Sequence, residues 1–485
     1  MTKKLSLAAV TLLLALCGLA QAQTITQLLH QPPDGAGIDF LLTDGTILAQ
    51  GNQGQDWWKL TPDINGSYVN GTWTQVASLA SNYDPYAFAS ATLADGRVLI
   101  EGGEYNFGVF SFTNLGAVYD PALNTWTPLT PPVGWGYIGD SPSTILPNGH
   151  FLIGRKFDTQ MAELDPSTMT WTALGSTGKA DWFAEEGWTL MPDGSVLTAD
   201  VLDNPNSERY LVGAQRWVTA GSTVANLQGP PEVGCIPYGG GEYCPPGEIG
   251  PAILRPDGTV FATGALHEGA STGHTAIFYP GLGPGQQPPT PTFPGMWFAG
   301  PDFPDGDNAG DNFAVLLTSG NVLVEGNSGR FYEFDGGRFF ATLFSNGGSL
   351  LVLPTGQILV GGSEVYNSTG TYNSTWQPVI TSVPSSVTRG QSYMISGVLF
   401  NGLSQANAFG DEFETATNYP LVRITNTATG HVFYAKTHDH SSMAVASHAT
   451  VSTHFDVPAG METGASSLVV VANGIPSTAV AITVN

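Results

Sequence analysis

The stretch ATLADGRVLIEGG, residues 91–103, joins a short apolar strand, an Asp-Gly turn and a second apolar strand. Asp-Gly pairs supply the positive φ angles of tight hairpin turns, so the stretch predicts a β-hairpin around Gly96. Residues 98–100 are apolar at successive positions, which is typical of a strand buried on both faces. The same pattern returns at six further turn glycines: Gly45, Gly149, Gly194, Gly258, Gly320 and Gly356.

A second element with spaced aromatic residues follows these hairpins. Tyr119 stands seven residues before Trp126 in VYDPALNTW, and Tyr210 stands seven residues before Trp217 in RYLVGAQRW. We interpret these aromatics as core packing between neighbouring repeats. Repeats of four strands with a period of about 50 residues are typical of a kelch-type β-propeller.

The repeat pattern also divides the chain. Residues 378–485 lack the hairpin phrase and end in SSLVVVANGIPSTAVAITVN, two strands with a turn, which favours an immunoglobulin-like β-sandwich. Residues 1–22 have two early lysines, an apolar run and a small-x-small cleavage site, as secretory signals do. We therefore predict an all-β protein: a signal peptide at 1–22, a seven-bladed kelch-type β-propeller at 23–377 and a β-sandwich at 378–485. Such a protein would be secreted to the extracellular space or the periplasm.

The charge and the cysteine content limit which binding partners and cross-links the chain can have. The net charge of −25 argues against binding to nucleic acid or to an anionic membrane, because both need basic patches. Outside the signal, the two cysteines are Cys235 and Cys244, in the loop CIPYGGGEYC. In an oxidising compartment they predict a disulfide, and a pair of thiolate metal ligands is the alternative. We expect a monomer.

The hairpin phrases resemble those of the galactose oxidase family. ILRPDGTVF at 253–261 and TLADGRVL at 92–99 are close to that family's blade phrase, and the resemblance covers nearly all of the chain after the signal. It implies a propeller with a C-terminal sandwich and a copper-radical site. At the positions that match the family's Tyr-His pair, however, this chain has Asn346 and Gly347. No copper-radical cofactor is therefore expected.

The resemblance also concerns a histidine. The family's C-terminal domain sends a histidine-bearing loop into the centre of the wheel. Residues 425–443, TNTATGHVFYAKTHDHSSM, are similar to that loop, with His438 at the matching place. Asp439 and His440 would add metal ligands beside it.

Acidic residues recur at one offset from the turn glycines. Asp140, Glu185 and Asp311 each stand nine residues before a turn glycine, and Glu248 stands ten before one. We expect them at one mouth of the channel, as catalytic or binding residues joined by His438. Crowded carboxylates raise one another's pKa, which suits acid–base work or a bound cation. A channel merely lined with polar groups that hold water is the alternative.

Two further metal ligands are candidates. Asp305 and Asp307 lie in PDFPDGDNAGDN, residues 301–312, which echoes a calcium loop. Ca²⁺ and a divalent transition metal both remain candidates for the cofactor. The transition metal is favoured if His438, Asp439 and His440 join the carboxylates.

Aromatic residues precede the same inner strands. They are Tyr86, Trp135, Tyr137, Trp182 and Tyr243. Flat apolar rings beside carboxylates can stack on a sugar ring while the acids bind its hydroxyls. The sequence thus predicts a secreted protein that binds a carbohydrate or polyol at the channel mouth. Two alternatives stay open: a metal-assisted lyase, hydrolase or non-radical oxidoreductase acting on a glycan, and a protein-interaction module.

Overall fold

The computed structural model describes residues 23–485 except 53, 231–235, 239–240, 244–246, 282–294 and 345–346. For residues 236–238, 241–243 and 344 it describes the backbone alone. The predicted signal peptide, the Cys235–Cys244 disulfide, the Tyr243 side chain and Asn346 lie outside the described parts. The helical elements of the described chain are short 3₁₀ turns: η1 (Val212–Ala214), η2 (Pro304–Gly306) and η3 (Ser374–Trp376). No helix in these ranges is long and apolar enough to cross a membrane. The described chain is therefore all-β.

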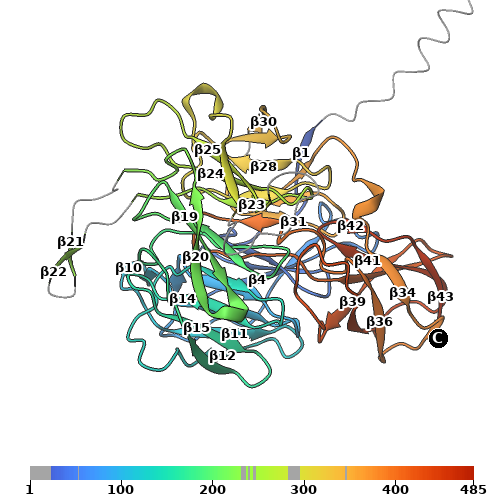
Figure 1. Ribbon diagram of the computed structural model, residues 1–485. Coiled ribbons are helices and arrows are strands. Elements are labelled where there is room, and N and C mark those ends of the chain that lie inside the picture. Colours follow the sequence, from blue (N-terminus) through green and yellow to red (C-terminus); the bar gives the residue numbers. More distant parts are fainter. Residues whose placement is uncertain are drawn as a thin grey trace, which may run out of the picture.

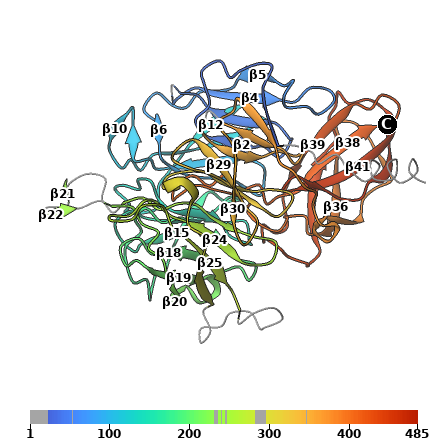
Figure 2. The ribbon, with the colours of Figure 1, turned by 90° about the horizontal axis from the view of Figure 1, so that it is seen from above.

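Seven sheets, here called the ring sheets, are built on four antiparallel strands each (Figures 1 and 2). The first holds β2 (Asp39–Leu41), β3 (Ile47–Gln50), β4 (Trp57–Thr61) and β5 (Thr72–Gln75). The second holds β7 (Ala89–Thr92), β8 (Val98–Glu101), β11 (Gly116–Asp120) and β12 (Thr125–Leu129). The third holds β13 (Ser143–Ile145), β14 (Phe151–Gly154), β15 (Met161–Asp165) and β16 (Thr170–Leu174). The fourth holds β17 (Thr189–Leu190), β18 (Val196–Ala199), β19 (Asn206–Leu211) and β20 (Arg216–Ser222).

The remaining ring sheets follow the same order. The fifth holds β23 (Ala252–Leu254), β24 (Val260–Thr263), β25 (Thr275–Tyr279) and β26 (Met296–Ala299). The sixth holds β27 (Ala314–Leu316), β28 (Val322–Glu325), β29 (Arg330–Phe334) and β30 (Phe339–Phe344). The seventh holds β31 (Leu350–Val352), β32 (Ile358–Val360), β33 (Glu364–Asn367) and, from the start of the chain, β1 (Thr24–Gln27). Because β1 pairs with β33, the two ends of the repeat region meet in one sheet.

The hairpins predicted from the sequence form the inner half of each ring sheet. The seven turn glycines have φ between 76° and 89°, a region that only glycine adopts without strain. The predicted double burial is confirmed for β8, β28 and β32, whose apolar residues are at most 1% exposed. The first strands of neighbouring sheets contact one another in the order β7, β13, β17, β23, β27, β31, β2. This arrangement around a common centre is consistent with a β-propeller.

The C-terminal region forms a separate sheet with its own apolar core. This sheet, here called the C-terminal sheet, holds β34 (Val379–Ser382), β35 (Ser386–Val387), β36 (Ser392–Val398), β38 (Leu421–Asn426), β39 (Val432–His438), β40 (Val451–Asp456), β41 (Gly464–Ala472), β42 (Ile475–Pro476) and β43 (Val480–Val484). A small sheet of β6 (Pro85–Tyr86), β9 (Tyr105–Asn106) and β10 (Val109–Phe110) lies on the side of the ring away from it (Figures 1 and 2). A hairpin of β21 (Ile236–Tyr238) and β22 (Gly241–Tyr243) completes the strands, apart from β37.

One long connection of the C-terminal sheet enters the ring. It comprises residues 399–420 between β36 and β38, here called the central segment, and contains β37 (Asn407–Ala408). β37 pairs with β27, the Gln405 side chain bonds to Leu190 N and Thr144 Oγ1, and Asn407 Oδ1 accepts from Val352 N. Inner strands have backbone groups without a neighbouring strand, so they need such partners. The central segment thus supplies hydrogen bonds to the inner strands of several ring sheets.

The segment predicted to enter the ring is a different one, and that expectation is wrong. Residues 425–443 form the hairpin of β38 and β39 and the turn after it. There Thr437 N bonds to Thr43 O and His440 N bonds to Ala94 O, both beside hairpin turns at the far end of the first strands. The predicted carboxylates precede those strands at their other end, up to about 30 Å of extended chain away. The hairpin therefore cannot bring His438 to them.

Candidate acidic binding site

Four predicted carboxylates and one lysine lie at one end of the first strands. Asp140, Glu185, Glu248 and Asp311 precede β13, β17, β23 and β27. Lys156 follows β14 in the third ring sheet and has no exposed surface. The central segment adds Asp411 and Glu412, both buried. These seven residues are here called the acidic site.

Lys156 is the ionic centre of the site. Its Nζ donates to Asp140 Oδ2, to Glu185 Oε2 at 2.6 Å and to Asp411 Oδ2 at 3.4 Å. Burial alone would lower the pKa of the ammonium, but the three carboxylates raise it well above its usual value. Lys156 therefore stays charged, and it joins the third and fourth ring sheets to the central segment.

The carboxylates outnumber this single cation. Burial raises the pKa of Asp140 to about 6, although Lys156 partly opposes the shift. Burial and the neighbouring acids raise the pKa of Glu248 to about 10 and that of Glu185 well above its ordinary range. Near pH 7 several of these groups therefore hold protons, and the site offers hydrogen-bond donors as well as acceptors.

The two acids of the central segment differ most sharply. Burial would raise the pKa of Asp411, but hydrogen bonds from Glu412 and Glu185 and the charge of Lys156 hold it below its usual value. Burial and the Asp411 charge raise the pKa of Glu412 well above its ordinary range. An ionised acceptor and a protonated donor thus stand side by side, which is the arrangement of acid–base pairs.

The backbone is strained where two of the carboxylates are held. Glu185 has φ of 48° and Asp311 has φ of 53°, values in the left-handed region that residues with a Cβ rarely adopt. Such conformations persist where the surrounding structure holds them, and they gather at functional sites. Here the strained turn at Glu185 holds its carboxylate 2.6 Å from Lys156 Nζ.

Partly exposed aromatic side chains lie beside the central segment, next to the acidic site. Tyr86 in β6 is 62% exposed, and its ring lies 6.2 Å from Tyr105 and 6.2 Å from Phe413 in the central segment. Phe110 is 44% exposed and lies 5.9 Å from Tyr105. Burial and then the charges of Glu412 and Asp311 raise the pKa of the Tyr86 phenol. We call Tyr86, Tyr105 and Phe110 the aromatic platform.

The other aromatic residues predicted to bind a ligand differ from Tyr86 in their exposure. Trp182 is 50% exposed and available to a ligand. Trp135 is only 6% exposed, and the guanidinium of Arg155 lies 5.8 Å from its ring and 4.9 Å from that of Tyr137. Since Arg155 covers faces of both rings, the prediction that Trp135 stacks on a ligand is wrong. The side chain of Tyr243 lies outside the described parts.

The predicted metal ligands do not join the acidic site. His438 Nδ1 pairs with Asp439 at 2.8 Å in the C-terminal sheet, and His440 Nδ1 bonds to Thr453 Oγ1 at 2.8 Å. In the 301–312 loop, Asp307 accepts from Ser328 and Tyr332, and Asp305 faces Arg330. A calcium loop is therefore not formed, because protein donors already use the Asp307 oxygens.

A second buried cluster joins the segment before β17 to β19 of the fourth ring sheet. Lys179 Nζ pairs with Asp181, with Glu186 at 3.1 Å and with Glu208 at 2.9 Å. Burial raises the pKa of Glu186 to about 8 despite the Lys179 charge. Glu186 thus belongs to this cluster and not to the acidic site.

The acidic site does not fit the copper-radical centre that the resemblance implies. Its described side chains are carboxylates and one ammonium, with neither imidazole nor thiolate among them. Ligand oxygens of Asp140, Glu185 and Asp411 do converge, but Lys156 Nζ already pairs with all three. The lysine supplies the positive charge that a cation would bring to these carboxylates.

Sequence reasoning missed Lys156, Asp411, Glu412 and the platform residues Tyr105 and Phe110. The sequence could have drawn attention to Lys156, because the chain has only 15 Lys and Arg residues and Arg155 and Lys156 are adjacent. The run DEFE at 411–414 is a second concentration of charge in a segment otherwise rich in Asn, Gln, Thr and Gly.

Comparisons with known proteins add likeness of fold alone. No protein-family model and no curated protein matches the chain. Among solved structures, a fungal alcohol oxidase of the AA5 family in complex with copper is 16% identical, with a TM-score of 0.48 over 95% of this chain and 98% of that one. Virginiamycin B lyase from Staphylococcus aureus is 9% identical, with a TM-score of 0.44 over 72% of this chain and 99% of that one. At these values the likenesses assign neither a family nor an activity.

Proposed function

We propose that this chain is a secreted, galactose-oxidase-like protein that binds a carbohydrate or polyol at the acidic site and the aromatic platform. In this proposal residues 23–377 are a seven-bladed kelch-type propeller, and residues 378–485 are an immunoglobulin-like sandwich whose central segment fills the channel. Removal of residues 1–22 accompanies secretion.

The observation that carries the proposal is the exposed ring of Tyr86 beside Glu412 and Asp311. A sugar presents an apolar C–H face and a rim of hydroxyls that both donate and accept hydrogen bonds. The exposed ring of Tyr86 offers a flat apolar face for the first. The carboxyl of Asp311, an exposed residue beside this ring, offers oxygens for the second.

The experiment is retention of the purified protein on immobilised glycans, compared with Tyr86→Ala. We expect Tyr86→Ala to lose about tenfold in affinity, as for loss of one stacked aromatic worth about 1–1.5 kcal/mol. Phe298→Ala is the matched control, since Phe298 is also an aromatic side chain, 51% exposed, but stands on β26 at the outer edge of the ring. The proposal would be refuted if Tyr86→Ala, Phe298→Ala and the wild type were retained equally on every glycan that the wild type binds.

The different pKa shifts of Asp411 and Glu412 favour a second function at the same site, an acid–base reaction on the bound ligand. Ionised Asp411 would accept a proton, and protonated Glu412 would donate one. Glu412→Gln keeps a hydrogen-bond donor but cannot give up a proton. Loss of turnover with unchanged glycan retention in Glu412→Gln supports catalysis, whereas full turnover in this variant contradicts it.

A further inference from the structure

We propose that His438, His454 and Asp439 bind a divalent transition metal on the C-terminal sheet, with Asp456 orienting His438. This site is separate from the acidic site and does not depend on the proposed function. Two imidazoles and one carboxylate are donors that Zn²⁺, Fe²⁺ and Mn²⁺ accept.

Strand register brings the two histidines together. His438 at the end of β39 is directly opposite His454 in β40, so the two side chains share one face of the sheet. Their rings lie 5.5 Å apart and nearly parallel, at 19°. Asp456 and Lys436, each two residues along the strand from one of the histidines, form the next opposite pair on this face.

A turn adds the carboxylate. Asp439 follows the end of β39 with φ of 53°, in the left-handed region, and this turns its side chain back over the histidines. Asp439 Oδ2 lies 2.8 Å from His438 Nδ1 and 3.9 Å from His454 Nδ1. The three ligand atoms of this group all lie within 4.8 Å of one another. Ligands of one tetrahedral metal with bonds of about 2.1 Å are about 3.4 Å apart, so small side-chain rotations close the site.

Two observations point to an ion rather than to a surface hydrogen-bond network. His454 Nδ1 is shielded from solvent yet has no hydrogen-bond partner, and it faces Asp439. The opposite ring nitrogen of His438, Nε2, lies 3.1 Å from Asp456 Oδ1. A carboxylate behind a ligating histidine is the usual second partner in metal sites, where it fixes the tautomer and the orientation of the ring.

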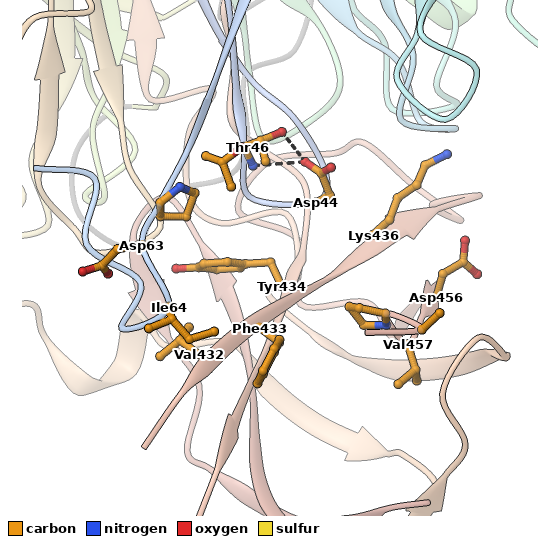
Figure 3. A pocket seen from close by; sticks show the side chains of 14 residues that line it. Asp44, Thr46, Asp63, Ile64, Val432, Phe433, Tyr434, Lys436, Asp456 and Val457 are labelled. Atoms are coloured by element: carbon orange, nitrogen blue, oxygen red, sulfur yellow. Dashed lines mark hydrogen bonds between the residues drawn. The ribbon is translucent and has the colours of Figure 1, made fainter. Parts of the chain in front are cut away.

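The site is open to solvent and adjoins a cleft. The side chains of His454 and Asp439 are 45% and 64% exposed, which leaves coordination positions for water or for a ligand. Asp456 and Lys436 also line a cleft of about 590 Å³ between the C-terminal sheet and the first ring sheet (Figure 3). A metal held at His438 would therefore stand at the edge of this cleft.

The test is Zn²⁺ titration of the full chain by calorimetry, with Co²⁺ absorption as a second readout. We expect one Zn²⁺ per chain at this site and at least tenfold weaker binding in His438→Gln and His454→Gln. Asp456→Asn should weaken binding about tenfold while keeping the Co²⁺ spectrum. His431→Gln is the matched control, because His431 is also a partly exposed histidine of the C-terminal sheet paired with a carboxylate, Glu462, at 2.7 Å.

Zn²⁺ affinity that is equal in the wild type and in the His438→Gln/His454→Gln double variant would overturn the proposal. A loss of the same size in His431→Gln would also overturn it, since binding would then be a general property of surface histidines. If the variants fail to fold, Mn²⁺ added to the wild type decides the question. Selective broadening of the His438 and His454 imidazole signals in nuclear magnetic resonance supports the site, and uniform broadening of all histidines refutes it.

Discussion

Replacement of Lys156 by methionine tests the ionic centre of the acidic site. Methionine matches the length of the lysine stem but brings no charge, so Asp140, Glu185 and Asp411 are left buried without their cation. At an effective dielectric constant of about 20, attraction across the 3.4 Å to ionised Asp411 amounts to about 5 kcal/mol, most of which offsets the cost of dehydrating both ions. Breaking such a buried pair lowers the free energy of unfolding by about 3–5 kcal/mol.

The loss should depend on pH in a defined direction. Without Lys156 the raised pKa values of Asp140 and Glu185 rise further in the folded state, and the lowered pKa of Asp411 rises as well. The pKa values in the unfolded state stay near 4. The folded variant then binds more protons than the unfolded chain, so its stability falls as pH rises. The difference from the wild type should be larger at pH 8 than at pH 4.5.

Urea denaturation followed by tryptophan fluorescence measures both effects. Lys59→Met, on β4 of the first ring sheet, is the control and should change stability by less than 1 kcal/mol. Adding Asp411→Asn to Lys156→Met should restore part of the loss, because it removes one of the stranded charges. The reasoning is refuted if Lys156→Met unfolds within 1 kcal/mol of the wild type at pH 8, or if its deficit is larger at pH 4.5.

Two further predictions concern strain and burial. Since Glu185 has φ of 48°, Glu185→Gly should be about 1 kcal/mol more stable than Glu185→Ala in the same denaturation assay, and the reverse order would show that the turn is unstrained. Burial raises the pKa of Glu414 from its usual range near 4 to about 8, so the wild type loses stability as pH rises through that window. Glu414→Gln has no carboxyl to ionise, so it does not lose stability in this way. Its free energy of unfolding relative to the wild type should therefore increase by at most about 1.4 kcal/mol per pH unit from pH 4.5 to 8. A difference in stability that is the same at every pH would contradict the raised pKa of Glu414.

Much of the ring could be predicted because its signals are local. A hairpin needs a turn glycine and two apolar strands within a dozen residues, and all seven such phrases form hairpins with positive φ at the glycine. The gathering of Asp140, Glu185, Glu248 and Asp311 follows from the same regularity. Residues at one offset from equivalent turns lie at one end of equivalent strands, whatever their neighbours are.

The histidine segment was misplaced because its placement is not local. Residues 425–443 and 399–420 both belong to the C-terminal region, and resemblance favoured the first because it contains histidines. In the structure the central segment enters the ring because its Gln405 and Asn407 side chains match unpaired backbone groups of inner strands. No repeating pattern in the sequence indicates that these side chains will pair with those backbone groups.

The strands, their turns and the end of the ring at which four carboxylates lie follow from the amino-acid sequence alone. The fold was needed to show that Lys156 lies among these carboxylates, that Asp411 pairs with it from 255 positions away, and that Tyr86 lies beside them. The two sets of features differ in how far along the chain the interacting residues are. Turn geometry and burial of a strand depend on neighbouring residues, whereas the charge state and partners of a buried ion depend on whichever distant groups the closed ring brings within a few ångströms.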